Sequence, residues 1–271
     1  MAKNKIIFID SDGTMMDSMN LKHFKAFGPA FVKTFELYSY EKEVLDEWNR
    51  LNLFSETRGI NRFDGCYQCL KFVNDNFKKI DLLDDLKYFL EHTTEKSKPA
   101  LEEYIQKNNK PKLKKVIDWS DLTNKLIAEY KDEVKPFDNA KEALKVLAKT
   151  YTVIIISSAN GKAIQEEWSK FGLIEYCTEV CTQEMGTKKV AISKMLKKYQ
   201  PQAALMLGDA LGDLDAANAN AINFFPIKPK QENESWAQLM TVYIKKFEQN
   251  GYSLIQNKIN QDFLDYLKSN N

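Results

Sequence analysis

Short, unbroken apolar runs constrain the fold of this chain more than any other feature of its sequence. Such runs are typical of strands that are buried on both faces of a parallel sheet. We expect five strands, at the following positions: Lys5–Asp10, Tyr151–Ser157, Thr178–Thr182, Ala203–Gly208 and Ala221–Pro226.

Amphipathic segments lie between these runs. Asp138 is the expected N-cap of a helix, whose apolar residues recur at helical spacing: Ala140, Ala143, Leu144 and Leu147. A second stripe has helical spacing too: Ile192, Met195, Leu196 and Tyr199. From residue 136 onward helices and strands alternate, which predicts an α/β fold with a Rossmann-like, doubly wound parallel sheet. Two further helices are expected after Pro229, around Glu234–Gln249 and Gln261–Lys268.

One long insertion interrupts this alternation. About 120 residues separate the first strand from Pro136 without a strand pattern, whereas connections in α/β units usually have about 2–6 residues. The insertion is rich in helix formers over Tyr40–Asn52, Leu82–Tyr104 and Ser120–Glu133. We therefore expect a catalytic core formed by residues 1–16 and 136–271, and an inserted, all-helical cap domain at residues 17–135.

The composition excludes several classes of partner. The chain has 39 basic and 38 acidic residues and a formal charge of +1. We therefore expect neither nucleic-acid binding nor attraction to an acidic membrane surface. The apolar run near the N-terminus, Ile6–Ile9, is too short for a secretory signal or a membrane span, so a cytoplasmic location is expected. Nothing in the pattern indicates an oligomeric state.

The four cysteines are expected to be reduced thiols in that location. Cys66 and Cys69 are spaced as neighbours on one face of a helix. A zinc site that combines them with Cys177 and Cys181 is the alternative, and it would require the two segments to meet.

Two carboxylates follow the first predicted strand. In Asp10-Ser11-Asp12-Gly13-Thr14 they leave the carboxyl end of a buried strand, where α/β sheets bind ligands. An EF-hand also starts Asp-x-Asp, but its required glycine and glutamate are replaced here by Met15 and Leu21. Neither the Walker spacing nor Gly-x-Gly-x-x-Gly occurs, which argues against a nucleotide-binding loop.

A second acidic pair, Asp209 and Asp213, follows the fourth predicted strand. Two such pairs at the carboxyl ends of parallel strands would bring up to four negative charges into one crevice. At about 4 Å and an effective dielectric constant near 20, each like-charge contact costs roughly 4 kcal/mol. A hard cation relieves that cost, and an all-oxygen set of ligands suits Mg²⁺ better than zinc.

Two further polar signals lie at strand ends or helix starts. Ser157 and Ser158 end the second predicted strand and carry hydroxyls that can bond an anionic oxygen. Lys188, at the start of a predicted helix, can neutralise a phosphoryl charge, although the adjacent Lys189 is an alternative for the same role.

Taken in chain order, these residues resemble the four motifs of the haloacid dehalogenase superfamily: Asp10-x-Asp12-Gly13-Thr14, Ser157, Lys188 and Gly208-Asp209-x-x-x-Asp213. The resemblance extends from Lys5 to about Pro226, and the helical insertion lies where members with a helical cap carry theirs. At two positions near helix ends the sequence departs from the usual pattern of this family. Lys189 stands where the family usually has proline, and Asn220 is expected to take the left-handed backbone that a glycine usually has.

The resemblance implies a role for each residue of these motifs. Asp10 would be the nucleophile that forms an aspartyl-phosphate. Asp12 would protonate the leaving oxygen and then deprotonate the attacking water. Ser157 and Lys188 would hold the phosphoryl oxygens. Further substrate-binding positions would be Gly13, Thr14 and Ser158.

The resemblance also implies the metal ligands. Mg²⁺ would be held by the Asp10 and Asp209 carboxylates and by the backbone carbonyl of Asp12, with Asp213 in support. A carboxylate at position 12 favours cleavage of a phosphate ester, because relatives that release halide need no proton donor there. The expected function is therefore a Mg²⁺-dependent phosphatase that acts on a small phosphorylated metabolite.

The cap is expected to determine which phosphate ester binds. The segment Thr57-Arg58-Gly59-Ile60-Asn61-Arg62 resembles the cap loop of β-phosphoglucomutase-like members, which implies that Arg62, with Arg58, holds a distal phosphate of the substrate. A sugar phosphomutase is one alternative function, although such mutases carry histidine where Lys22 stands here. A non-catalytic regulator that binds a phosphorylated metabolite is the other, and it would not need Asp10 and Asp12.

Overall fold

The computed structural model of the protein describes residues 4–269, which divide into two compact units. The first unit combines the residues up to Met19 with Val134–Ser269, and the second consists of Asn20–Glu133. The outermost residues of the expected core, 1–3 and 270–271, lie outside the described residues.

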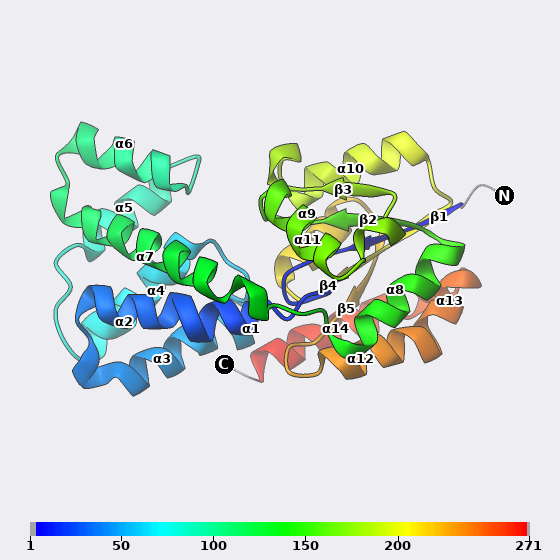
Figure 1. Cartoon of the computed structure of the whole chain (residues 1–271), viewed down its shortest axis with the longest axis horizontal. Helices are drawn as coiled ribbons and strands as arrows, with labels where there is room; N and C mark the ends of the chain where they lie inside the picture. Colours follow the sequence, from blue (N-terminus) through cyan, green and yellow to red (C-terminus); the bar gives the residue numbers. More distant parts are fainter. Residues whose placement is uncertain (1–3, 270–271) are drawn as a thin grey trace. The chain divides into compact units, whose positions relative to one another are not determined.

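A five-stranded sheet forms the centre of the first unit. All four strand pairings are parallel, and the strands lie in the order β3-β2-β1-β4-β5. Figure 1 shows helices on both faces of the sheet. The prediction of a doubly wound α/β fold is thereby confirmed, and every expected strand is present: β1 (Lys5–Ile9), β2 (Thr152–Ile156), β3 (Glu179–Cys181), β4 (Ala203–Gly208) and β5 (Asn223–Pro226).

The register of the central strand brings three strand ends to one edge of the sheet. Ile9 of β1 lies opposite Ile155 on β2 and Leu207 on β4. Since β1 has β2 on one side and β4 on the other, the strand order reverses here. Ligands of open α/β sheets bind at such a switch point, outside the carboxyl ends of the strands.

Seven helices accompany the sheet in the described part of the first unit. On one face, residues of β1 and β2 such as Phe8 and Ile154 pack with apolar residues of α10, α11 and α14. The helices are α8 (Asp138–Thr150), α9 (Gly161–Lys170), α10 (Lys188–Tyr199), α11 (Leu211–Ala219), α12 (Glu232–Gln238), α13 (Ile244–Glu248) and α14 (Gln256–Lys268). A π-helical turn at Leu239–Tyr243 joins α12 to α13, and short 3₁₀ turns lie at Ile174–Tyr176, Gln183–Met185 and Tyr252–Leu254.

The second unit is wholly helical, since residues 20–133 contain no strand. Its helices are α1 (Met19–Lys22), α2 (Gly28–Phe35), α3 (Glu41–Asn49), α4 (Arg62–Asn76), α5 (Leu83–His92), α6 (Lys98–Asn108) and α7 (Lys114–Tyr130). Two π-helical turns, His23–Phe27 and Arg50–Phe54, continue α1 and α3, and 3₁₀ turns lie at Tyr38–Tyr40, Pro111–Leu113 and Lys131–Glu133.

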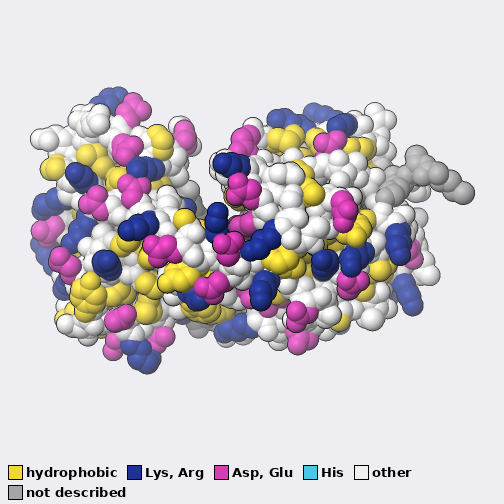
Figure 2. All heavy atoms as spheres, in the orientation of Figure 1, with side chains coloured by type: hydrophobic (Ala, Val, Ile, Leu, Met, Phe, Trp, Pro, Cys, Tyr) yellow, Lys and Arg dark blue, Asp and Glu magenta, His cyan; other side chains and the backbone are white. Residues whose placement is uncertain are grey.

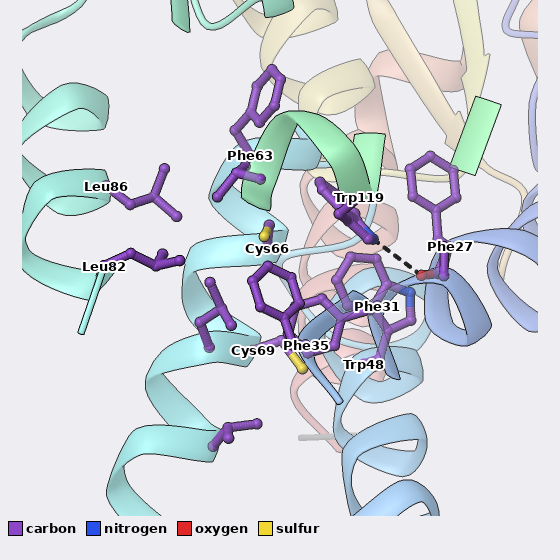
Figure 3. Close-up of a cluster of buried hydrophobic side chains, with 14 of the residues drawn as sticks. Phe27, Phe31, Phe35, Trp48, Phe63, Cys66, Cys69, Leu82, Leu86 and Trp119 are labelled. Atoms are coloured by element: carbon purple, nitrogen blue, oxygen red, sulfur yellow. Dashed lines mark hydrogen bonds between the residues drawn. The ribbon is translucent and has the colours of Figure 1, made fainter. Parts of the chain in front are cut away.

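An aromatic cluster forms the core of this helical unit (Figure 3). The ring of Phe31 lies 5.2 Å from that of Trp48, centroid to centroid, and meets Trp119 edge-on at 6.4 Å. The Cys66 and Cys69 thiols project into the same core from α4, as their helical spacing predicted, and burial raises the pKa of both. Among residues 4–269, no group of potential metal ligands includes a cysteine.

The predicted helical stripes are confirmed, but several helix ends differ. In α8 the residues Ala140, Ala143, Leu144 and Leu147 are buried as expected. The N-cap, however, is Phe137 rather than Asp138. The amide of Phe137 donates to the Met15 carbonyl at 3.0 Å, which ties residue 137 into the extended backbone that an N-cap needs. Asp138 instead occupies the first turn, where a negative charge favours the helix dipole.

The expected conformation of Asn220 is also wrong, because the left-handed residue is Ala221, with φ of 51°. The side chain of Asn220 donates to the carbonyls of Ala216 at 2.8 Å and Lys189 at 3.0 Å, and so closes the end of α11. The segment Leu82–Tyr104, which is rich in helix formers, contains α5 and the first part of α6, and the Ser97 side chain caps the start of α6.

Positive and negative side chains are interspersed over the face shown in Figure 2. No helix among the described residues has both the length and the apolar character that a membrane span requires.

Candidate active site

Asp10 is the first residue after β1, the central strand. Its amide still donates to the Leu207 carbonyl of β4, at 3.0 Å, so the sheet fixes its backbone. Its carboxylate is buried, with 4% of the residue exposed, and lies 2.8 Å from the Nζ of Lys188. The sheet thus holds a carboxylate at the switch point, next to an ammonium group.

Asp213 lies in the first turn of α11 and is fully buried. Its Oδ2 accepts from the backbone amides of Asp209 and Ala210, both at 3.2 Å. Gly208 makes this arrangement possible, since a Cβ there would lie 2.3 Å from the Cβ of Asp213. The carboxylate of Asp213 therefore stabilises the turn that carries Asp209.

Lys188 connects the two acidic strand ends. Its Nζ lies 2.6 Å from Oδ1 of Asp213 as well as 2.8 Å from Asp10. Lys189 is exposed and contributes its backbone carbonyl to Asn220 instead. Of the two lysines that the sequence left open, the structure brings Lys188 into the acidic cluster.

The charges of this cluster are unbalanced. One oxygen each from Asp10, Asp209 and Asp213 lie within 4.8 Å of one another, and all three residues are buried. Burial raises the pKa of Asp10 well above its ordinary value, and the Asp213 and Asp209 carboxylates add to that effect while Lys188 opposes it. Burial would lower the pKa of Lys188, but the Asp10 and Asp213 carboxylates raise it overall.

Three buried carboxylates against one ammonium leave an excess of negative charge. A divalent cation would compensate it, and carboxylate oxygens are the ligands that hard cations prefer. The donor set of Asp10, Asp209 and Asp213 therefore fits a divalent metal.

Asp12 lies outside this acidic cluster. It is partly exposed, and its carboxylate accepts a short hydrogen bond from the buried hydroxyl of Ser18. Gly13, with φ of 77°, turns the chain so that its amide reaches the Met16 carbonyl at 2.9 Å. The turn brings Thr14 back toward β4, where its hydroxyl donates to Asp209 at 2.9 Å.

The two serines at the end of β2 differ in exposure. Ser157 is buried, and its hydroxyl oxygen accepts from the Ala159 amide at 3.1 Å. Its own amide donates to the Cys181 carbonyl, so it extends the sheet by one residue. Ser158 is exposed. Ser157 therefore lies at the sheet edge that carries Asp10, and its side chain shapes the loop before α9.

The three arginines of the chain all lie between residues 50 and 62, in the helical unit. Arg58 is 2% exposed, and its Nη1 donates to the Leu53 carbonyl at 2.6 Å. Arg62 is only partly buried. Its guanidinium lies over the Phe27 ring, 5.2 Å from the centroid, and Nη1 donates to the side chains of Ser120 and Asn124.

His23 lies in the π-helical turn of this unit and is 8% exposed. Its Nδ1 accepts from the Trp48 indole at 3.0 Å, and its ring stacks on Phe27. These contacts hold the imidazole in the core of the helical unit.

Sequence reasoning missed several contacts of the Asp10–Thr14 segment. Ser18 donates to the Asp12 carboxylate, and Trp168 of α9 donates to the Ser11 hydroxyl. Neither contact could be predicted from the sequence, because a single polar or aromatic residue has no characteristic spacing. Trp236 of α12 is fully buried. Its indole also donates to the Thr14 carbonyl at 2.9 Å, which no local pattern indicates.

A family model described as haloacid dehalogenase-like hydrolase matches residues 60–227, which is more than half of the chain. The chain belongs to this family of enzymes. The matched range contains Ser157, Lys188, Asp209 and Asp213, and it begins after Asp10. None of the curated protein sequences matches the chain.

Solved structures resemble the chain over most of its length. A protein of Bacteroides fragilis described as a haloacid dehalogenase-like hydrolase is 14% identical, with a TM-score of 0.50 over 85% of this chain and 92% of that one. A predicted phosphoglycolate phosphatase from Haemophilus somnus is 15% identical, with a TM-score of 0.49 over 90% and 99% of the two chains. At these identities the similarity concerns the fold.

The close approach of Gly208 to Asp213 yields a test. Gly208→Ala should lower the free energy of unfolding by about 1–3 kcal/mol, because the new methyl displaces the Asp213 side chain. Gly212→Ala is the matched control, since a Cβ there meets nothing within 4 Å. It should leave stability unchanged or raise it by up to about 1 kcal/mol, as alanine favours a helix. Urea denaturation measures both, and equal midpoints for the two variants would contradict this packing.

Proposed function

We propose that this hydrolase is a phosphatase of a small phosphorylated metabolite and that Asp10 is its nucleophile. The observation that carries the proposal is the position of the Asp10 carboxylate: buried at the switch point, 2.8 Å from the Lys188 ammonium, and in the same oxygen cluster as Asp209 and Asp213. A nucleophile beside a fixed positive charge is what transfer of an anionic phosphoryl group requires.

In the first half of the reaction, an Asp10 carboxylate oxygen attacks phosphorus while the bond from phosphorus to the ester oxygen breaks. Asp12 gives its proton to that leaving oxygen, so an alcohol departs and an aspartyl-phosphate remains. In the second half, Asp12 takes a proton from water, and the resulting hydroxide attacks phosphorus. Inorganic phosphate leaves and the Asp10 carboxylate is restored.

Ser157 and Lys188 would bind the non-bridging phosphoryl oxygens in both halves. Lys188 already lies between two carboxylates, which orient its ammonium group before substrate arrives. Gly13, Thr14 and Ser158 would supply further contacts to the phosphoryl group. Ser18 accounts for the orientation of Asp12, because its hydroxyl donates to that carboxylate.

The metal that we propose for the acidic cluster is Mg²⁺. The Asp10 and Asp209 carboxylates and the Asp12 carbonyl would hold it, and Asp213 would support it. When bound, Mg²⁺ supplies positive charge that lowers the repulsion between an anionic nucleophile and an anionic substrate. Without a divalent cation, the three carboxylates would keep phosphate esters away from Asp10.

We further propose that the helical unit is the cap that selects the substrate and that Arg62 binds a distal phosphate. The support is its partial exposure and its orientation by Phe27, Ser120 and Asn124. A guanidinium held in this way is suited to bidentate recognition of a phosphate. Arg58 contributes less directly, since its side chain binds the Leu53 carbonyl.

The first prediction concerns the nucleophile. Asp10→Asn should lower phosphate release to below about a thousandth of the wild-type rate, as removal of a nucleophile does in other hydrolases. Release is measured over a panel of phosphorylated metabolites, with and without Mg²⁺. Asp215→Asn, an exposed position on α11, is the control and should retain activity.

The same assay separates the alternative functions. A phosphomutase would release little phosphate and would interconvert sugar phosphates once a bisphosphate is added. A regulator would bind its metabolite equally well in wild type and Asp10→Asn, with no turnover in either. Mg²⁺-independent release that survives Asp10→Asn would contradict the proposed mechanism altogether.

The second prediction compares the adjacent lysines. Lys188→Ala should reduce kcat by about 10²–10³-fold, because it removes a donor that faces the developing phosphoryl charge. Lys189→Ala should change kcat by less than about twofold, since the exposed side chain lies outside the cluster. Steady-state kinetics on the best substrate measures both. Equal losses in the two variants would refute the assignment.

The third prediction concerns the cap. For substrates with a second, distal phosphate, Arg62→Ala should reduce kcat/KM by about 10–100-fold, because a charged hydrogen-bond donor is lost. For p-nitrophenyl phosphate, which has no distal group, kcat/KM should stay within about twofold. Arg50→Ala, which breaks only a pairing with Glu47, is the control. Unchanged turnover across all substrates would show that Arg62 is not the anchor.

A further inference from the structure

Two tryptophans from different helices meet the loop that follows β1. Trp168 of α9 and Trp236 of α12 are both fully buried. The indole N–H of Trp168 donates to the Ser11 hydroxyl, and that of Trp236 donates to the Thr14 carbonyl, both at 2.9 Å. The two bonds thus reach the residues immediately before and after Asp12-Gly13.

The sheet does not hold this loop. The last ladder bond of the segment is the one from the Asp10 amide to Leu207. Beyond it, the Ser11 carbonyl accepts from the amides of Thr14, Met15 and Met16, at 3.3, 3.0 and 2.9 Å. At its far end the segment is tied to residues 135–137, since the Phe137 amide donates to the Met15 carbonyl at 3.0 Å and the Asp17 amide to the Lys135 carbonyl at 2.8 Å. The loop therefore has a defined internal shape, and its orientation on the sheet depends on contacts with other elements.

We propose that Trp168 and Trp236 are positioning residues, which clamp the loop so that Asp10 and Asp12 keep the spacing that phosphoryl transfer needs. The expected effect on catalysis rests on the proposed function. The two hydrogen bonds that form the clamp do not, because they are present in the structure itself. Neither indole is part of the metal or phosphate site. Each acts through the loop residue to which it donates.

Two observations distinguish a clamp from ordinary core packing. A buried indole N–H needs an acceptor, and any free carbonyl would satisfy it. Both acceptors here nevertheless belong to one short loop, 157 and 222 residues away in sequence from the tryptophans that reach them. The other two tryptophans, Trp48 and Trp119, donate to His23 and Phe27 within the helical unit.

Thr14 connects the clamp to the acidic cluster. Its carbonyl accepts from Trp236, and its hydroxyl donates to Asp209 at 2.9 Å. A displacement of Thr14 would therefore change the orientation of Asp209 as well as that of the loop. Because misplacement of reacting groups by about 1 Å can cost about 10²-fold in rate, a small movement here has a measurable effect.

The test removes each indole N–H and keeps an aromatic ring. For Trp236→Phe and Trp168→Phe we expect kcat to fall by about 10–100-fold, with KM within about twofold of wild type. Amide hydrogen exchange of the segment 11–16 should become faster in both variants, because the loop opens more often. This exchange measurement needs no substrate and no metal.

Tyr252→Phe is the matched control. Its buried hydroxyl donates to the Phe224 carbonyl at 3.0 Å, so it also removes one buried aromatic donor from the same unit, away from the loop. It should leave the exchange of segment 11–16 and kcat unchanged. If Trp236→Phe does not fold, the isosteric amino acid 3-benzothienylalanine at position 236 removes only the N–H.

The outcomes are separable. Faster exchange together with a selective fall in kcat supports the clamp. Exchange and kcat that both match those of Tyr252→Phe overturn it, as does faster exchange with an unchanged kcat. If wild type releases no phosphate, the proposed function fails, and exchange alone then decides whether the indoles hold the loop.

Discussion

The ion pairs of Lys188 with Asp10 and Asp213 are the interactions on which the rest of the site depends. Buried charges are costly unless they are paired and hydrogen-bonded. The lysine pairs with two carboxylates, and the backbone amides of Asp209 and Ala210 satisfy the second oxygen of Asp213. The three carboxylates still leave an excess of negative charge, which β1, β4 and the helices α10 and α11 hold in place. This excess makes the edge of the sheet suited to a divalent cation.

The sheet positions this charge only as far as its hydrogen-bond ladder extends. Asp10 is the last residue of its segment with a ladder bond, and the reaction that we propose also needs Asp12, two residues further on. Beyond Asp10, side chains rather than ladder bonds position the loop. Ser18 orients the Asp12 carboxylate, Thr14 connects the loop to Asp209, and two indoles hold the loop from outside. Buried aromatic residues thus combine packing with a single directed hydrogen bond.

The helical unit has a core of its own, built around Phe31, Trp48 and Trp119. Its apolar side chains form a cluster separate from the one that packs on the sheet. Arg62 illustrates the arrangement, because the Phe27 ring beneath its guanidinium belongs to the same unit. In the function that we propose, the core unit would supply the chemistry that all phosphate esters share, and the helical unit the contacts that differ between them.

The sequence by itself determined the parallel sheet and the meeting of Asp10 with Asp209, since buried strands have continuous apolar runs and their carboxyl ends share one edge. It also indicated which helix faces are buried. Only the tertiary structure showed that Lys188 lies in the acidic cluster and Lys189 outside it, since the two differ by a rotation of about 100° on one helix. It alone showed that Arg58 is buried while Arg62 is partly exposed, and that Trp236 reaches Thr14. Periodicity encodes which face of a segment is apolar. The partner of a buried polar atom is decided by the packing of segments that lie far apart in the chain.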